Sequence, residues 1–508
     1  MFSKLWTIAL EGIGATLVEV ESQIENGLFS FSIVGLAGIS IKEAKDRVSA
    51  ALRNSGFIFP RKRLTINLAP ADLRKEGSAF DLPIALGLLA ATGQIRSDHL
   101  SKYVCLGELS LEGRLRSVRG VLPAALAVRK IGKLGLIVPE ENADEAAVAE
   151  GVPIYPVGSL RDAADFINGD DVVEPYTVNL QELFAEQQRY DVDFSEVKGQ
   201  ARAKRALEIA AAGNHNILLI GPPGSGKTML ARRLPTILPP PTLDEALETT
   251  QIHSVAGALK TTTSLMAIRP FRKPHHTISS AGLIGGGSVP VPGEVSLAHR
   301  GVLFLDEFPE FGKTTLDSLR QPLEDGEVVI ARVASTIRFP SRFLLAAAMN
   351  PCPCGYLGDS QRECVCNQNA VRNYRARISG PLLDRIDLHV PVPAVRPEEL
   401  NLRSEGETSL TIRERVIAAR QRQINRFSKL GIYSNGEMSS SHIRKFIQLS
   451  LETENVLRQA IKRLSLSARA HFRSIKVART IGDLAGRDEI TQSDILEAVG
   501  FRELDREV

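Results

Sequence analysis

Apolar and polar residues alternate in the first part of the chain, which is the pattern of half-buried strands. Residues 15–21 alternate along Ala-Thr-Leu-Val-Glu-Val-Glu, and residues 28–34 alternate in the same way. Asn26-Gly27 lies between the two segments and is a typical hairpin turn. We therefore expect these segments to pair as a hairpin, after a first strand within residues 1–10.

Two other segments of the N-terminal part carry helical signals. Ser40 and Glu43 have the spacing of a capping box, and the apolar residues that follow recur on one face of a helix over 41–52. A second helix is expected over 81–91, where apolar residues dominate. Strands and helices mixed in this way predict an α/β domain without a nucleotide motif.

The middle of the chain has short continuous apolar runs, and the last part has helical periodicity. Residues 216–220, 301–305 and 343–349 predict buried strands of a parallel sheet. From Thr411 onward helices are expected, the last of them capped at Thr491. The predicted fold class is α/β, divided into an α/β domain at 1–168, a polar linker at 169–190, a P-loop domain at 191–393 and a helical lid at 394–508.

A complete phosphate-binding loop follows the first of these apolar runs and precedes a predicted helix. Glycines let backbone N–H groups close around phosphate oxygens, and the helix N-terminus adds partial positive charge. Lys227 is expected to reach the β- and γ-phosphates of ATP, and Thr228 to ligate Mg²⁺. The predicted nucleotide-binding residues are Gly221, Pro222, Pro223, Gly224, Ser225, Gly226, Lys227 and Thr228.

An acidic pair ends the second apolar run. Asp306 is expected to hold Mg²⁺ through water, and Glu307 to polarise the attacking water. Either motif alone is compatible with a glycine-rich turn or with a buried strand that has acidic ends. Because both occur in order along the chain, we expect hydrolysis of a nucleoside triphosphate.

The stretch between Lys227 and Asp306 is too long for one crossover. Its basic segment 269–276 is followed by glycines and prolines up to Gly293, so we expect a protruding loop with a basic root. Residues 327–339 predict a hairpin that carries Arg332 and Arg338. These elements either contact the substrate or are solvated surface loops.

Two further residues are candidates for the hydrolysis site. Asn350 ends the third apolar run, where an amide would orient the hydrolytic water. Arg385 precedes another strand and is expected to act on a neighbouring subunit's γ-phosphate as an arginine finger. The alternative for Arg385 is an internal ion pair with Asp384 or Asp387.

Four of the five cysteines are clustered on two Cys-x-Cys pairs. Four thiolates on two short turns are a ligand set for structural Zn²⁺, and four free thiols are the alternative. The fifth, Cys105, lies in an apolar strand and is expected in the core. The predicted zinc ligands are Cys352, Cys354, Cys364 and Cys366.

Composition narrows the class of protein. With 508 residues, the chain is too long for a single hydrophobic core. A net charge of +3 means that a nucleic-acid surface would be a local patch. No apolar stretch is long enough to span a membrane, and the N-terminal apolar run is broken at Glu11 without a cleavage site. We therefore expect a cytoplasmic protein without a membrane partner.

These features together resemble the AAA+ ATPases, in the branch with a helix-2 insert and a hairpin before the sensor-1 strand. Magnesium chelatase ATPase subunits and MCM helicases share that branch. The chain is most similar, over essentially its whole length, to the magnesium-chelatase-like proteins of the YifB/ComM type. The segments that carry this resemblance are 269–277, 292–299, 306–311 and 349–355.

The resemblance implies roles and an assembly state. It implies that Asn350 is sensor 1 and that Arg469, in Leu-Ser-Ala-Arg-Ala, is sensor 2. It also implies a homo-oligomeric, hexameric ring. ComM proteins are associated with ATP-driven branch migration of DNA during natural transformation.

The N-terminal part resembles the Lon-type protease domain but lacks its chemistry. Its nucleophile position holds Ala79, and its dyad lysine position holds Leu122, whereas Ser78 is one position out of register. A dyad needs a hydroxyl and a nearby amine that accepts its proton. We therefore expect an inactive protease fold that assembles the ring or binds nucleic acid.

The predicted protein is a ring-forming ATPase that uses ATP, Mg²⁺ and a structural Zn²⁺ ion. Its expected partner is DNA, whether single-stranded, duplex or branched, and its expected activity is that of a branch-migration helicase. A protein-remodelling ATPase, a chelatase motor and an ATP-dependent protease are the alternatives.

Overall fold

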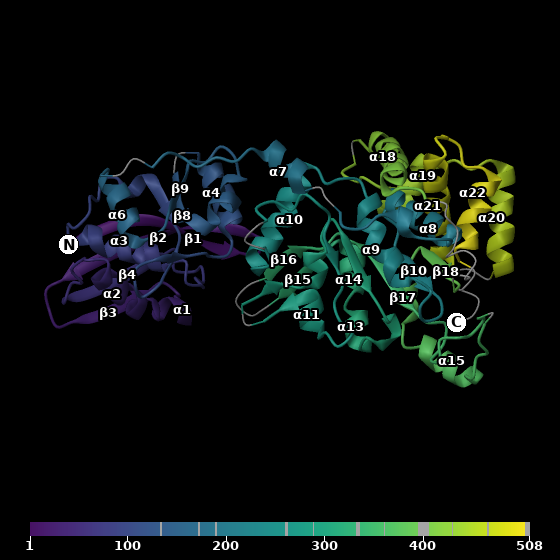
Figure 1. Ribbon diagram of the computed structural model, residues 1–508, viewed down its shortest axis with the longest axis horizontal. Coiled ribbons are helices and arrows are strands. Elements are labelled where there is room, and N and C mark those ends of the chain that lie inside the picture. Colours follow the sequence, from purple (N-terminus) through teal and green to yellow (C-terminus); the bar gives the residue numbers. More distant parts are fainter. Residues whose placement is uncertain are drawn as a thin grey trace. The chain divides into compact units, whose positions relative to one another are not determined.

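The computed structural model divides the chain into two compact units (Figure 1). The described residues are 1–132, 135–170, 173–187, 190–259, 263–287, 289–331, 336–359, 361–394, 406–428, 430–464 and 467–502. Unit 1 is formed by Met1–Gln187, Leu243–Ala267 and Ala331–Phe339, and unit 2 by Gln188–Thr242, Ile268–Ile330 and Pro340–Val508. Among the described residues, no helix is both long and apolar enough to cross a bilayer.

Unit 1 contains a mixed seven-stranded sheet. In spatial order its strands are β3 (Ser30–Val34), β4 (Arg63–Ala69), β2 (Gly14–Glu25), β1 (Phe2–Glu11), β5 (Tyr103–Cys105), β8 (Gly135–Pro139) and β9 (Ile154–Val157). A small sheet joins β6 (Glu108–Leu109) to β7 (Leu115–Arg116). The helices of the unit are α1 (Ile39–Lys42), α2 (Ala44–Asn54), α3 (Asp81–Ala91), α4 (Val121–Ile131), α5 (Ala143–Ala147), α6 (Leu160–Asn168), α7 (Leu180–Gln187) and α10 (Leu243–Ala256).

The predicted helix over 81–91 is confirmed as α3, and every one of its residues is buried. The predicted hairpin around Asn26-Gly27 is wrong. Strand β2 pairs with β1 and β4, and β3 pairs in parallel with the far side of β4. The predicted capping box is also wrong, because the Ser40 hydroxyl accepts a hydrogen bond from the Gly77 N–H instead.

Helix α10 is a part of unit 1 that no sequence signal predicted. It packs on α4, and Ala246 and Leu265 join the buried cluster that contains Val121 and Val128. The Ser254 hydroxyl donates to the carboxylate of Glu145, a residue whose pKa is raised by burial. The segment Leu243–Ala267, which follows the helix over Lys227–Ile237, is therefore anchored in the core of unit 1.

Unit 2 is built on a parallel five-stranded sheet. The strand order is β11 (Phe271–Arg272), β14 (Val302–Leu305), β17 (Leu344–Met349), β10 (Ile217–Ile220) and β18 (Leu388–Pro391). The predicted strands over 216–220, 301–305 and 343–349 are confirmed as β10, β14 and β17. They are buried almost throughout, as parallel strands covered on both faces are.

Helices cover this sheet and extend into a C-terminal bundle. Around the sheet lie α8 (Ala201–Gly213), α9 (Lys227–Ile237), α11 (Ser280–Ile284), α12 (Glu294–Leu297), α13 (Lys313–Asp317), α14 (Arg320–Asp325), α15 (Gln368–Arg375) and α16 (Gly380–Leu383). The C-terminal helices are α18 (Ser409–Arg426), α19 (Ser440–Phe446), α20 (Leu451–Leu464), α21 (Ala468–Leu484) and α22 (Gln492–Gly500). The expected cap of the last helix is confirmed, because Thr491 and Asp494 form a capping box.

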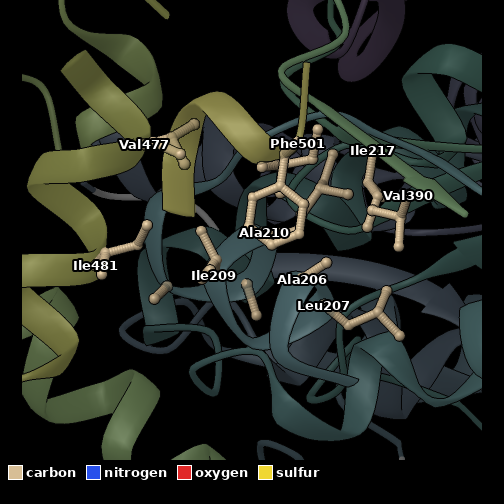
Figure 2. Close-up of a cluster of buried hydrophobic side chains, with 14 of the residues drawn as sticks. Ala206, Leu207, Ile209, Ala210, Ile217, Val390, Val477, Ile481 and Phe501 are labelled. Atoms are coloured by element: carbon tan, nitrogen blue, oxygen red, sulfur yellow. The ribbon is translucent and has the colours of Figure 1, made fainter. Parts of the chain in front are cut away.

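Helix α8 joins the sheet to the C-terminal helices. Figure 2 shows its side chains Ile209 and Ala210 between Ile481 of α21 and Ile217 of β10. The apolar cluster is continuous from the strands to Phe501. Packing of this kind makes the P-loop sheet and the helical lid one compact unit, and the boundaries predicted at 168, 190 and 393 stay predictions.

Two hairpins lie in the connections between strands of the five-stranded sheet. Strands β12 (Gly285–Gly286) and β13 (Val291–Pro292) pair antiparallel within the glycine- and proline-rich segment. Strands β15 (Glu327–Ala331) and β16 (Thr336–Pro340) form the second hairpin, as predicted. Arg332 falls outside the described residues, whereas Arg338 lies on β16.

Candidate functional site: a nucleotide-binding loop and two acidic residues

The phosphate-binding loop runs from the end of β10 to the start of α9. Gly224 and Gly226 have φ values of 76° and 89°, which a residue with a side chain adopts only at a cost. A Cβ atom at Gly221 would lie 1.9 Å from the Val392 carbonyl oxygen, so the loop also passes close to the end of β18. Glycine is therefore required at these positions for backbone shape and for space.

Lys227, the first residue of α9, is held in place by acceptors. Its Nζ donates to the carbonyl oxygens of Gly221 at 2.7 Å and Pro222 at 2.8 Å, and to Oδ1 of Asn350 at 3.3 Å. Burial lowers the pKa of the Lys227 ammonium, against the opposing charge of Asp306. The structure thus brings together two of the predicted site residues, Lys227 and Asn350, from adjacent strands of the sheet.

Asp306 directly follows β14 and contacts Thr228, the second residue of α9. The Thr228 hydroxyl donates to Oδ2 of Asp306 at 2.8 Å. A hydroxyl and a carboxylate are the oxygen ligands that Mg²⁺ takes in phosphate-binding sites, so this pair fits the ion. The Nζ of Lys273 lies on the same Asp306 oxygen, also at 2.8 Å.

Glu307 has an unusual backbone conformation beside this pair. Its φ is 53°, in the left-handed region that costs a residue other than glycine about 1 kcal/mol or more. Strain of that kind at an acidic residue next to a phosphate loop is typical of functional positions. Its carboxylate is largely exposed, and Oε2 lies 3.0 Å from Nδ1 of His276.

Lys273 and His276 are the functional contacts that the sequence reasoning missed. Both belong to the basic segment 269–276, which was expected to contact the substrate. The segment continues from β11, and β11 pairs in parallel with β14, the strand that ends just before Asp306. Parallel pairing brings the residues after both strands to one sheet edge, but no sequence pattern marked the two-residue strand β11.

Arg385 is engaged within its own chain. Its guanidinium pairs with Glu324 of α14 and donates to the Pro381 carbonyl oxygen at 2.5 Å. The internal pair with Asp384 or Asp387 that the sequence left open does not form; the acceptor is Glu324 instead. Within the described part of the chain, the buried Nε of Arg385 has no hydrogen-bond acceptor.

Arg469, near the start of α21, is exposed on the lid. Its guanidinium lies 3.9 Å from Oδ2 of Asp384, which is a loose ion pair. One turn further along, Arg473 pairs with the buried Asp387. Asp384 and Asp387 thus both pair with arginines of α21.

The four clustered cysteines form a compact group after Asn350. All four Sγ atoms lie within 4.8 Å of one another, and the Cys352–Cys364 and Cys354–Cys364 separations are 3.7 and 3.6 Å. Zinc bound tetrahedrally by thiolates at about 2.3 Å places the sulfur atoms about 3.8 Å apart, so the group fits Zn²⁺. The N–H of Tyr356 helps lower the pKa of the Cys354 thiol to about 6, whereas burial and the neighbouring thiols raise the pKa of Cys364 to about 12, so the fit to Zn²⁺ rests on the positions of the four sulfur atoms.

The cysteine loop also lies against the phosphate-binding loop. A Cβ atom added at Gly355 would lie 2.7 Å from Cδ of Pro223. Gly355 has a φ of 88° as well, so both space and backbone shape require glycine there. The four-cysteine group therefore adjoins the candidate nucleotide site in the fold as well as in the sequence.

The protease positions of unit 1 carry no hydroxyl–amine pair. The hydroxyl of Ser78 donates to the carboxylate of Glu108, and the Nζ of Lys75 is buried on the carbonyl oxygens of Gly35 and Pro70. Leu122 is fully buried in the apolar core. Ser78 and Lys75 thus bind other groups, whereas a Ser–Lys dyad requires its hydroxyl and its amine to contact each other.

Comparisons with known proteins agree with this geometry. Three family models match in order: "Subunit ChlI of Mg-chelatase" over residues 20–142, "Magnesium chelatase, subunit ChlI" over 193–400, and "Magnesium chelatase, subunit ChlI C-terminal" over 406–502. Together the three models cover most of the chain, including the P-loop sheet and the C-terminal helices.

Several relatives match the chain over almost its whole length. The chain is 44% identical over 505 residues to competence protein ComM of Haemophilus influenzae, covering 99% of this chain and 97% of that protein. It is likewise 44% identical over 505 residues to YifB of Escherichia coli, with the same coverage. A shorter match, 31% identical over 167 residues, is to Lon protease 2 of Bacillus subtilis, covering 30% of this chain and 29% of that protein. Matches of this identity and extent show that the chain belongs to the ComM/YifB family of magnesium-chelatase-like AAA+ ATPases.

Proposed function

We propose that this protein is an ATP-driven motor that assembles into a homo-oligomeric ring, hexameric in its full form, and acts on DNA in the cytoplasm. Its proposed activity is helicase-type branch migration, in recombination or natural transformation. Competence is the process named for the relative ComM, and the match to that protein covers nearly the whole chain. The remaining support comes from the chemistry of the site.

One observation supports the proposal that DNA is the substrate. Lys273 and His276 contact the two acidic residues of the hydrolysis site, and both come from the basic root of the glycine- and proline-rich insert. A motor needs a substrate-binding element that is connected to its hydrolysis site. Because the root of the element is basic, it suits a phosphate backbone.

The residues of the site would divide the work of hydrolysis. Lys227 and the loop N–H groups bind and orient the phosphates, while Thr228 and Asp306 hold Mg²⁺, which neutralises charge that develops on the transferred phosphoryl group. Glu307 polarises the attacking water, and Asn350, bonded to Lys227, orients that water. Each role matches the position of its residue at the edge of the parallel sheet.

Two arginines would act where subunits meet. We propose that Arg385 is the arginine finger and that Arg469 is the sensor-2 residue. Arg385 has to leave Glu324 to reach a neighbour's nucleotide, and its unpartnered Nε offers a donor for that second position. A pair that forms inside one chain and breaks in the ring would restrain hydrolysis before assembly.

We also propose that the four cysteines hold one structural Zn²⁺ ion. All four tetrahedral positions would be filled by thiolates, which leaves none open for catalysis. The loop between the cysteine pairs would then keep a fixed shape beside Pro223.

The test compares substrates directly. ATP turnover is measured without substrate and with single-stranded DNA, duplex DNA, a four-way junction or an unfolded protein, and the Glu307→Gln variant reports contaminating hydrolysis. We expect the largest stimulation with DNA, and strand exchange on the junction only when ATP is hydrolysed. Stimulation by the unfolded protein alone would favour a protein-remodelling ATPase and overturn the proposal.

The DNA-contacting elements have a test of their own. Replacing Arg332 and Arg338 with Ala should weaken DNA binding and flatten its salt dependence by about one to two units, because phosphate contacts release counterions. The matched control is Arg458→Ala with Arg463→Ala, which removes the same charge from exposed positions of α20. An unchanged salt slope in the hairpin variant would move the DNA site to another surface.

A further inference from the structure

A single oxygen of Asp306 serves two donors from different parts of unit 2. Its Oδ2 accepts from the Thr228 hydroxyl and from the Lys273 ammonium, each at 2.8 Å. Thr228 belongs to the nucleotide-binding helix α9, whereas Lys273 follows edge strand β11. This oxygen therefore contacts both the nucleotide site and the root of the insert.

Lys273 is mechanically connected to the insert. The preceding residue, Arg272, forms a two-pronged ion pair with Glu294 of α12, with both N–O distances at 2.7 Å. Glu294 directly follows Gly293, whose backbone lies so close to Gly285 that a Cβ atom would be 2.3 Å from the Gly285 nitrogen. Any shift of Lys273 away from Asp306 thus acts on a segment tied to both ends of the β12–β13 hairpin.

The ion pair between Lys273 and Asp306 is suited to exchange. The side chain of Lys273 is 43% exposed and that of Asp306 is 26% exposed, so water competes with the pair. Pairs of this exposure stabilise their bound geometry only weakly. A divalent cation held by Thr228 and Asp306 would carry more charge onto the same oxygen and would repel the ammonium.

We propose that Lys273 competes with Mg²⁺ for Asp306 and thereby links the loading of the nucleotide site to the position of the insert. This inference rests on the proposed role of Thr228 and Asp306 as the magnesium site. When Mg²⁺ and nucleotide bind, Lys273 leaves Asp306 and becomes available to a phosphate group. Because linkage is reciprocal, a polyanion that captures Lys273 raises the affinity of the site for Mg²⁺ by the same factor.

The first experiment measures Mg²⁺ affinity without DNA and without hydrolysis. Binding of a fluorescent ADP analogue is titrated with Mg²⁺ for the parent, Lys273→Met and Lys273→Arg. We expect the Met variant to lower the Mg²⁺ concentration at half-saturation about two- to fivefold, the range of an exposed ion pair, and the Arg variant to stay near the parent.

The control for general loss of positive charge is Lys313→Met, at the exposed start of α13. This variant should leave the half-saturation point unchanged. Competition at Asp306 is refuted if Lys273→Met does not lower the half-saturation point, or if Lys313→Met lowers it equally.

The second experiment follows the lysine itself. The parent protein is acetylated briefly with ADP alone or with ADP and Mg²⁺, and modification at Lys273 is compared with that at Lys313 by mass spectrometry. We expect Mg²⁺ to raise the relative reactivity of Lys273 because its amine loses the Asp306 carboxylate. Equal reactivity while Mg-ADP is bound would overturn the inference. Failure of DNA to stimulate turnover would instead count against the proposed function alone, because neither experiment here contains DNA.

Discussion

Asp387, at the junction between the sheet and the lid, offers a stability test that is independent of nucleotide. Its buried carboxylate pairs with Arg473, accepts the Asn216 N–H at 3.1 Å and lies 3.4 Å from Nδ1 of His215. Burial alone would raise the pKa of Asp387, but the charge of Arg473 and the nearby imidazole of His215 outweigh burial and hold this pKa well below its usual range.

The perturbation is Asp387→Asn, which keeps the shape of the side chain and removes its charge. Breaking a buried ion pair from one side costs about 3–5 kcal/mol. The side chain of Arg473 remains 22% exposed and so keeps some hydration, which lowers our expectation to about 2–4 kcal/mol. For a unit of this size, that loss corresponds to a fall in Tm of about 4–8 °C.

The assay is thermal or urea unfolding of the full chain, followed by a probe of the C-terminal helices. Asp384→Asn is the matched control, since Asp384 is more exposed and its partner Arg469 is 3.9 Å away. We expect that control to change stability by less than about 0.5 kcal/mol. A loss below about 1 kcal/mol for Asp387→Asn would refute the reasoning that this carboxylate holds the two layers together.

The pH dependence has a definite sign. A carboxyl group whose pKa is lower in the folded state stabilises the fold above its unfolded pKa of about 3.9, and this contribution is lost as pH falls through the folded value. The stability difference between the parent and Asp387→Asn should therefore be full at pH 6 and shrink below about pH 4. A difference that grows on acidification would show that the charge of Asp387 is not the cause.

Three further predictions concern the hydrolysis site and the cysteines. Glu307→Gln should bind ATP like the parent but hydrolyse it at least about 10²-fold more slowly, because no carboxylate polarises the water; turnover near the parent rate would exclude Glu307 as the base. Arg385→Ala should lose about 10³–10⁵ in turnover and regain part of it in rings mixed with Glu307→Gln, whose arginine is intact; equally inactive mixed rings would argue against a finger acting between subunits. Replacing Cys364 and Cys366 with Ser should release about one Zn²⁺ ion per chain and destabilise unit 2, as measured by elemental analysis and unfolding; a parent protein purified without chelator that contains no metal would contradict the zinc assignment.

Short-range signals predicted the strands of the parallel sheet well. Strands β10, β14 and β17 are continuous apolar runs, and each is followed by a candidate site residue, so a local pattern was enough to find them although their spatial order is β14, β17, β10. The start of the last helix could also be predicted, because the capping at Thr491 is a contact between residues three positions apart.

Contacts distant in sequence could not be predicted in this way. Asn26-Gly27 was predicted to be the turn of a hairpin, but β4 lies between β2 and β3 and pairs with both. No local sequence pattern indicates that a third strand is inserted there. Strand β11 has only two residues, too few for any periodic pattern, yet it brings Lys273 and His276 to the acidic pair. Likewise, the choice of Glu324 as the partner of Arg385 depends on how α14 packs.

The docking of α10 in unit 1 limits how this chain can be cut or recombined. A truncation that begins after residue 187 would keep Leu243–Ala267 but remove the apolar surface on which these residues are buried. Ala246 and Leu265 would then face water, and Ser254 would lose its acceptor Glu145. The ATPase portion expressed alone should consequently aggregate, and a shorter fragment becomes soluble only if the excursion from 243 to 267 is replaced by a polar loop. The two units are interleaved along the chain, so they have to be inherited and engineered as one piece.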